Sequence, residues 1–450
     1  METAIELVRN RFLEYGDNEA IFWHGQTISY NALYDMVDVW HRRLEALNVK
    51  AGDICGILGD FSPSVAALFF ALMEKRCILV PLTKSLKVID EFIEIAQIGH
   101  MFTFSLEDDS YVYDNLHRTV NNDLLKKQIA LQRSGLIVFS SGSTGKPKGI
   151  LQDCERVMNK FVKPRKPWRT ILFLMMDHFG GFNTFLSIFA NGGLAVCLPT
   201  HSVEDVCHAI EISRANLLPT TPTFLNLLIA SHCYKRFDLS SIELITYGTE
   251  MMNETTLANV KKILPAARLK QTYGLSELGV LRSKTDDESS TWLKVGGEQF
   301  KLKVVDNVLW IKAESNMVGY LNAPDPFDAD GWFCTGDEVE QKGEYIRFLG
   351  RKSEIINVGG QKVFPAEVEA VILEDENVQE VTVYGKSHPL MGNIVAAKVS
   401  LERPEDVRLF TTRIRKLCNS RLDKYKIPVK IDVLDESAQY NNRFKKIRNI

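Results

Sequence analysis

The sequence lacks any long apolar run. Its longest, Val65–Met73, falls far short of the ~20 residues that a membrane-spanning helix requires, and it ends in the charged residues 74–76. At the N-terminus, Glu2, Glu6, Arg9 and Arg11 interrupt what would be the apolar core of a secretory signal. We therefore expect neither a membrane span nor a signal peptide.

Paired metal-binding or disulfide-forming motifs are also missing. The eight cysteines form no CxxC pair and the nine histidines form no HExxH pair, which argues against a zinc site or a disulfide framework. A reducing, cytoplasmic setting fits this cysteine usage best. Basic residues are not in excess either, because the formal net charge is -3. Nucleic-acid binders normally carry a basic surplus, so no nucleic-acid partner is expected.

The composition that remains is that of a large globular protein. The 450 residues, 45% of them hydrophobic, suffice for two or three domains. Short apolar segments typical of strands alternate with segments of helical periodicity, which predicts parallel βαβ units and an α/β class. The predicted helices are 30–47, 62–73 and 88–98, and the predicted strands are 53–58, 77–81 and 136–139.

The last hundred residues differ from the rest. A segment rich in glycine and charge, 350–362, precedes a predicted helix at 365–373, strands at 378–385 and 394–401, and an amphipathic helix at 407–422. This order would form a small α+β domain. We place the domain boundary near Gly350, giving domains 1–350 and 351–450.

The clearest chemical signal is the segment Ser140–Gly149 (SSGSTGKPKG), which follows a predicted apolar strand. Glycines allow a tight loop whose backbone N–H groups face an anion, and hydroxyl and lysine side chains can bind phosphate oxygens. The segment does not match GxxxxGK[ST], so it is not a Walker motif. A flexible linker is the alternative, although linkers seldom follow a core strand directly.

This loop resembles the phosphate loop of adenylate-forming enzymes, the family of acyl- and aryl-CoA synthetases, carrier-protein adenylation domains and luciferases. Other family motifs follow in the same order. They are Tyr273–Glu277 (YGLSE), Thr335–Asp337 (TGD), Gly350–Arg351 with Gly359–Gly360 and Glu367–Glu369, and a basic C-terminal segment containing Lys446. The resemblance extends from about Tyr30 to the end of the chain. It implies a large N-terminal domain of mixed sheets flanked by helices and a small, mobile C-terminal α+β domain.

The resemblance implies an ATP site. Its phosphate-binding residues would be Ser140, Ser141, Gly142, Ser143, Thr144, Gly145 and Lys148. Tyr273, with Gly274, would stack on the adenine, Ser276 would contact the α-phosphate, Asp337 would accept both ribose hydroxyls, and Arg351 would support the ribose. Gly248, Thr249 and Glu250 are placed in the same site by the resemblance.

Two charges complete the implied catalytic site. Glu277, with Thr144, would hold Mg²⁺, a hard cation that bridges phosphates. Lys446 would bridge the substrate carboxylate and the α-phosphate. The family segment reads Gly-Lys where this chain has Lys445 and Lys446, and we choose Lys446 because Ile447 follows it.

The acid itself is less defined. Asp177–Gly181 resembles the segment at the mouth of the family's acid pocket, and His178 occupies its aromatic or histidine position; a histidine satisfied within the core is the alternative. Amino-acid-activating members place an aspartate where this chain has Phe179. A buried ammonium there would be costly, which argues against an α-amino acid unless Asp177 substitutes. Gly180, Gly181, Gly248 and Gly279 leave room for an aryl or an alkyl group.

The second half-reaction would pass the acyl group to a thiol. Gly359 and Gly360 would let the backbone approach a pantetheine arm closely. A thiol is already partly ionised at neutral pH, so no dedicated base is required. The leading hypothesis is a CoA ligase. The alternatives are a ligase that loads a carrier-protein phosphopantetheine and a non-catalytic nucleotide-binding homologue.

Overall fold

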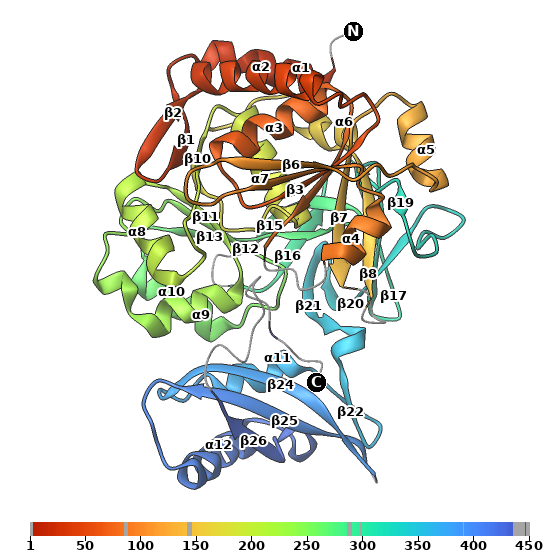
Figure 1. The fold of residues 1–450 in the computed structure, drawn as a ribbon. Coiled ribbons are helices and arrows are strands. Elements are labelled where there is room, and N and C mark those ends of the chain that lie inside the picture. The colour runs from red at the N-terminus through yellow and green to blue at the C-terminus, as the bar shows by residue number, and fades with distance from the viewer. Residues whose placement is uncertain are drawn as a thin grey trace. The chain divides into compact units, whose positions relative to one another are not determined.

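The computed structural model describes residues 3–84, 89–141, 146–285, 290–297, 299–389, 391–434 and 446, without the side chains of residues 141 and 282. The chain divides into two compact units. Figure 1 labels helices and strands of both. The first comprises Met1–Pro219, Gly274–Leu281 and Ala313–Pro326, and the second comprises Thr220–Tyr273, Arg282–Lys312 and Phe327–Ile450. Among the described residues, no helix is long and apolar enough to cross a membrane.

The first unit contains a seven-stranded sheet. Its strands, in spatial order, are β19 (Gly319–Tyr320), β8 (Pro147–Asp153), β7 (Gly135–Ser141), β4 (Ile78–Leu82), β3 (Ile54–Leu58), β5 (His100–Phe104) and β6 (Tyr111–Asn115). The four central strands β7, β4, β3 and β5 run parallel, as βαβ units require. A second set of strands, β1 (Glu19–Trp23), β2 (Gln26–Ser29), β9 (Arg169–Ile171), β10 (Leu194–Val196) and β11 (Leu217–Thr220), pairs in the order β11-β9-β10-β1-β2.

The first unit's helices pack through aromatic side chains. They are α1 (Ala4–Tyr15), α2 (Tyr30–Ala46), α3 (Pro63–Glu74), α4 (Ile89–Ala96), α5 (Asp123–Ala130), α6 (Cys154–Met158), α7 (Phe179–Ala190) and α8 (Val203–Ser213). Helix α3 begins with Ser62 as its N-cap and Pro63 in its first turn, and ten of its twelve residues are buried. The rings of Phe12, Phe70 and Phe189 join α1, α3 and α7 in edge-to-face or tilted contacts.

The second unit carries the remaining elements. Helices α9 (Pro222–Ser231) and α10 (Glu254–Ile263) accompany the parallel pair β12 (Leu244–Tyr247) and β13 (Arg268–Gln271). An antiparallel sheet follows the order β15 (Gly279–Thr285), β16 (Leu293–Gly296), β21 (Tyr345–Arg351), β20 (Phe333–Lys342), β18 (Val308–Ala313) and β17 (Phe300–Val305).

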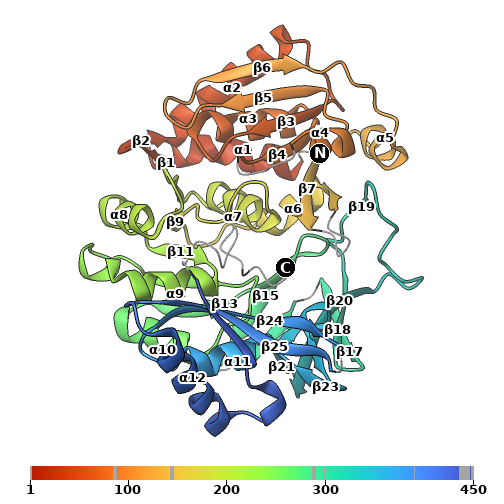
Figure 2. The ribbon, with the colours of Figure 1, turned by 60° about the horizontal axis from the view of Figure 1, so that its bottom comes forward.

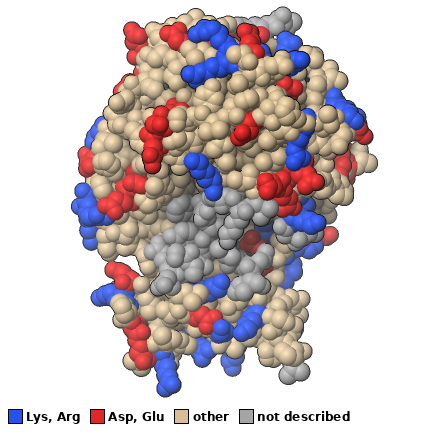
Figure 3. Space-filling view, viewed as in Figure 1, with Lys and Arg blue, Asp and Glu red and all other residues tan. Residues whose placement is uncertain are grey.

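In the face shown in Figure 3, acidic and basic side chains are intermingled, in keeping with the small net charge.

The last hundred residues build a sheet of their own. It contains β22 (Ile356–Val358), β23 (Gln361–Val363), β24 (Val378–His388), β25 (Gly392–Leu401) and β26 (Lys430–Val433). Helices α11 (Pro365–Ile372) and α12 (Val407–Arg421) accompany this sheet (Figure 2). They share one apolar core with it, through residues such as Ile372, Val383 and Phe410. The α+β character expected for this region is thus present. The boundary near Gly350 remains a prediction.

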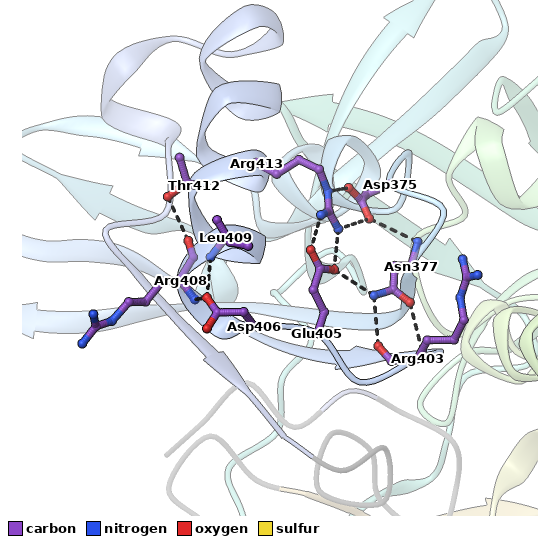
Figure 4. Close-up of polar contacts among 9 residues, drawn as sticks. All are labelled: Asp375, Asn377, Arg403, Glu405, Asp406, Arg408, Leu409, Thr412 and Arg413. Atoms are coloured by element: carbon purple, nitrogen blue, oxygen red, sulfur yellow. Dashed lines mark hydrogen bonds and ion pairs between the residues drawn. The ribbon is translucent and has the colours of Figure 1, made fainter.

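An ion-pair network fastens α12 within this part of the chain (Figure 4). The Arg413 guanidinium donates to both oxygens of Asp375, at 2.6 and 3.1 Å, and also to Glu405. The Asn377 side chain donates to Glu405 at 2.9 Å. These hydrogen bonds hold the pKa of Glu405 down at about 2, with Arg413 the larger cause and Asn377 the next.

Candidate active site

Asp337, Tyr273, Arg351 and Phe348 form a cluster in the second unit, here called the Asp337 cluster. Asp337 on β20 lies directly opposite Arg351 on β21 in the antiparallel ladder. Its carboxylate accepts hydrogen bonds from the Tyr273 hydroxyl at 2.6 Å and from Arg351 Nε at 3.2 Å. The Tyr273 ring stacks on Phe348, with centroids 4.4 Å apart. Three residues that sequence motifs assigned to the nucleoside are therefore adjacent.

The electrostatics of the Asp337 cluster suit Asp337 to accept hydrogen bonds. Burial raises the pKa of Asp337, and the nearby Arg351 charge pulls that pKa in the opposite direction. Burial, followed by the charge of Asp337, raises the pKa of Tyr273 well above its ordinary value. Tyr273 accordingly stays a phenol that donates, and Asp337 is the acceptor that a pair of ribose hydroxyls would need.

Gly248, Thr249 and Glu250 follow β12 in a backbone that suits few residues. Thr249 has a φ of 70°, in the left-handed region that β-branched residues rarely adopt. A Cβ on Gly248 would lie 2.6 Å from the Thr272 carbonyl oxygen. Glu250 accepts from the Thr223 hydroxyl at 2.7 Å and from the backbone N–H of Lys446 at 2.9 Å. The structure thus places Lys446 beside this segment.

The Lys446 side chain is held by carboxylates. Its ammonium lies 3.0 Å from Glu369 and 3.1 Å from Glu380, and it donates to the Val381 carbonyl at 2.8 Å. Side-chain exposure is 9% for Lys446, 5% for Glu369 and 0% for Glu380. Burial raises the pKa of Glu380, while Lys446 opposes that rise. In this arrangement Lys446 is ion-paired and buried rather than presented to a substrate.

Gly359 and Gly360 form the two-residue turn of a hairpin between β22 and β23. Both have positive φ, 57° and 90°, which suits the primed turns that match the twist of paired strands. On the same hairpin, Lys362 pairs at 2.7 Å with Glu338, the neighbour of Asp337. The two glycines are therefore explained by a turn, and their contact with a thiol substrate remains a prediction.

Glu277 and Ser276 belong to the first unit. The Glu277 carboxylate accepts from the Tyr320 hydroxyl at 2.7 Å, and Lys148 lies 5.3 Å from the centre of the Tyr320 ring. The Gln152 side chain donates to the Ser276 carbonyl. A Cβ on Gly274 would lie 2.9 Å from the Gly279 carbonyl oxygen, so this position requires glycine. In the described part of the chain, no group of three His, Cys, Asp or Glu could hold a metal ion.

His178 is the N-cap of α7. Its ring nitrogen Nδ1 accepts from the Gly180 backbone N–H at 3.1 Å, which places the proton of the neutral ring on Nε2. Thr83 donates to the neighbouring Asp177 at 3.2 Å. The arrangement gives His178 a structural role, and a catalytic one remains a prediction.

Part of the predicted phosphate loop, Ser140–Gly149, lies outside the described residues. Gly142, Ser143, Thr144 and Gly145, and the side chain of Ser141, lie outside the described residues. Ser140 on β7 pairs with Lys148 on β8, so the two described ends of the loop are adjacent in an antiparallel ladder.

Several supporting residues escaped the sequence analysis. Phe348 stacks on Tyr273, Tyr320 orients Glu277, and Glu380 holds Lys446. Phe348 and Tyr320 carry no motif, because their contacts depend on strand pairing between distant segments. A glutamate within the apolar strand β24 was a signal for Glu380, since a buried carboxylate needs a partner.

Comparison with known proteins gives a consistent result. A family model described as "AMP-binding enzyme" matches residues 8–321, and one described as "AMP-binding enzyme C-terminal domain" matches residues 367–443. An indoleacetate–CoA ligase of Aromatoleum aromaticum is 28% identical, over 97% of this chain and 95% of its own length. A 2-succinylbenzoate–CoA ligase of Bacillus subtilis is 25% identical, over 96% and 94%.

The solved structures agree on the fold. An anthranilate CoA ligase in complex with anthranoyl-AMP superposes with a TM-score of 0.82 at 18% identity, covering 98% of this chain and 96% of the other. At that identity the likeness is one of fold.

Proposed function

Because this chain belongs to the AMP-binding enzyme family, we propose that it is an ATP-dependent acid–thiol ligase. It would activate a carboxylic acid as acyl-AMP, release pyrophosphate, and transfer the acyl group to CoA. The relatives named above are CoA ligases. The observation that carries the proposal is the Asp337 cluster, which presents a buried carboxylate beside an aromatic ring and a guanidinium.

In the first half-reaction the acid's carboxylate attacks the α-phosphorus of ATP. Both reactants are anions, so catalysis depends on positioning and on stabilising the developing charge. Asp337 and Arg351 would fix the ribose, and Tyr273, supported by Phe348, would stack on the adenine. The loop Ser140–Gly149, including Thr144 and Lys148, would hold the β- and γ-phosphates.

Lys446 would stabilise the charge shared by the carboxylate and the α-phosphate. In the structure its ammonium is paired with Glu369 and Glu380, so it would have to leave them before the reaction. Its backbone N–H donates to Glu250, so Lys446 itself lies beside Gly248–Glu250.

Glu277 fits a magnesium ion. It is a hard oxygen ligand held in place by Tyr320, and Mg²⁺ is commonly bound through one or two carboxylates together with phosphate oxygens and water. With Thr144 as a further ligand, the ion would offset phosphate charge. The Asp337 cluster and the loop Ser140–Gly149 would bind and orient the nucleotide.

The thiol half-reaction would follow a movement of the C-terminal domain, for which we propose residues 351–450. The Gly359–Gly360 turn would then approach the pantetheine arm of CoA. The Lys362–Glu338 ion pair is one contact that such a movement must break. Water can solvate the exposed lysine after the pair breaks, but the buried glutamate would need a new partner or a proton, so other contacts made in the movement must offset that cost.

A cytoplasmic location is part of the proposal. None of the eight cysteines, all within the described ranges, forms a disulfide. Thiols that stay reduced are typical of that compartment.

Acid-dependent release of pyrophosphate tests the proposed function. Purified protein is incubated with Mg-ATP and a panel of aryl, short-chain and long-chain acids, with and without CoA. Turnover with one class of acid that rises on addition of CoA is the expected result. Release that stalls near one equivalent with CoA present would identify a carrier-protein phosphopantetheine as the acceptor. No release with any acid, together with ATP binding, would favour the non-catalytic homologue.

A further inference from the structure

Lys160 is a half-buried cation with only neutral partners. It lies in the 3-10 turn η1 (Asn159–Phe161), and its ammonium donates to the Asn183 side-chain oxygen on α7. The ammonium also lies 5.0 Å from the centre of the Phe161 ring and 5.9 Å from that of Phe179. Within the described ranges, no carboxylate lies at ion-pair distance from it.

This environment opposes the charge that Lys160 carries. Burial, followed by the charge of Arg165, lowers the pKa of Lys160 to about 7. A glutamine could donate the same hydrogen bond to Asn183 without desolvating an ammonium. The charge itself therefore calls for an explanation beyond packing, and cationic groups kept in such surroundings are concentrated at functional sites.

The position of Lys160 connects it with the segments assigned to the acid. Phe179 is the first residue of α7 and follows His178, the α7 N-cap. The edge of its ring lies 3.7 Å from the place that a Cβ on Gly279 would occupy. Lys160 thus contacts one residue of Asp177–Gly181, and that residue in turn contacts the glycine that leaves room for the substrate.

A second source of positive potential converges on the same place. Phe179 and Asn183 are the first and fifth residues of α7, so the Lys160 ammonium lies alongside the first two turns of a twelve-residue helix. The N-terminal end of a helix carries a partial positive charge. An ammonium beside it is disfavoured in the empty site and favoured once an anion is bound.

We propose that Lys160 is a specificity-determining residue and that the acid substrate carries a second carboxylate, which Lys160 binds while the first is activated. The inference rests on the proposed function, because the first carboxylate is the one that reacts with ATP. It narrows the substrate class to dicarboxylic acids, in which the distal carboxylate supplies the counter-ion that the protein does not.

The test compares matched acids and matched variants. Pyrophosphate release is measured with the pairs phenylacetate and (2-carboxyphenyl)acetate, and pentanoate and glutarate. The variants are Lys160→Gln, which keeps a donor for Asn183, Lys160→Arg, which keeps the charge, and Lys163→Met, which removes an exposed lysine of the same loop.

We expect the wild-type protein to prefer the diacid of at least one pair. Lys160→Gln should lower kcat/KM for that diacid by roughly 10- to 100-fold, mainly through KM, since a hydrogen bond to a charged group contributes about 1.5–3 kcal/mol. The monoacid should change less than about twofold. Lys160→Arg should restore most of the preference, and Lys163→Met should leave it unchanged. Equal losses for both members of a pair, or no loss, would refute the proposal.

Acid binding without turnover separates this inference from the proposed function. Calorimetric titration of the protein with each diacid and with its monoacid measures binding of the acid and requires no reaction with ATP. Tighter binding of the diacid than of its monoacid, lost in Lys160→Gln, supports the role of Lys160 even if no acid releases pyrophosphate. Equal binding of both acids by the wild-type protein would refute it even if the protein proves to be a ligase.

Discussion

Asp337 combines two demands on one carboxylate. It must be buried to stay in place opposite Arg351, yet it must keep enough acceptor capacity for a ligand. The Tyr273 hydroxyl and the Arg351 guanidinium provide the hydrogen bonds that make its burial tolerable. Loss of its charge should therefore weaken ligand binding as well as the hydrogen bonds within the Asp337 cluster.

Replacing Asp337 with asparagine tests this role. The amide keeps the shape but accepts through only one atom, so we expect the dissociation constant for ATP to rise roughly 10- to 100-fold. Calorimetric titration with Mg-ATP measures it. Asp330→Asn, at an exposed position of the same segment, is the control and should bind as the wild type does. An unchanged affinity in Asp337→Asn would contradict the assignment.

At the scale of single residues, sequence motifs indicated candidate site residues but not the residues that hold them in place. Tyr273, Asp337 and Arg351 were assigned because their segments resemble motifs of adenylate-forming enzymes, and their roles remain predictions. Phe348 and Tyr320 were not, because stacking on Tyr273 and orienting Glu277 are tasks that many side chains can perform. The ion pairing of Lys446 with Glu369 and Glu380 depends on tertiary packing that no local pattern encodes.

Among the elements, the turn after β12 leaves little room for a larger residue. A Cβ on Gly248 would lie 2.6 Å from the backbone oxygen of Thr272. That oxygen cannot move without shifting the backbone directly after β13. We expect Gly248→Ala to lower the free energy of unfolding by about 2 kcal/mol, as overpacking does. Chemical denaturation measures it. Gly99→Ala, where the added carbon meets only ordinary contacts at 3.8 Å and beyond, should be nearly neutral.

The network on α12 predicts a dependence on pH. The pKa of Glu405 is lowered in the folded state, so its contribution is present above an ordinary carboxyl pKa of ~4.3 and is lost as pH falls toward about 2. We expect Arg413→Met to lower the melting temperature by a few degrees at pH 6. The difference from the wild type should shrink at pH 3 and vanish near pH 2. A difference that persists in acid would show that Arg413 acts through contacts other than its pair with Glu405, such as those with Asp375.

Helices and central strands were predictable because their periodicity is strong. The predictions at 30–47, 62–73 and 407–422 correspond to α2, α3 and α12 within one or two residues. The antiparallel strands between β14 (Tyr273–Leu275) and β21 were not assigned from the sequence. In strands such as β17, apolar and polar residues alternate only over a short stretch, and the strand is partly exposed along its length, so burial does not follow the pattern.

For the whole molecule, the two half-reactions should separate at Lys446. We expect Lys446→Ala to abolish formation of acyl-adenylate, because the developing charge loses its cation, while thioester formation from supplied acyl-adenylate continues. Single-turnover assays of each step measure this. Lys445→Ala is the matched control and should retain both steps. Equal loss of both steps in Lys446→Ala, or the adenylation defect in Lys445→Ala instead, would contradict this division.

The pairing of one ammonium with Glu369 and Glu380 links catalysis to the solvent's protons. When Lys446 withdraws to reach a substrate, it leaves two neighbouring carboxylates that are almost fully buried. Repulsion between them and the cost of burial both favour binding of one proton. Each departure of the lysine would then take up a proton and each return would release it. Each conformational cycle would thus exchange a proton with the solvent, and the heat measured by calorimetry would depend on the ionisation enthalpy of the buffer.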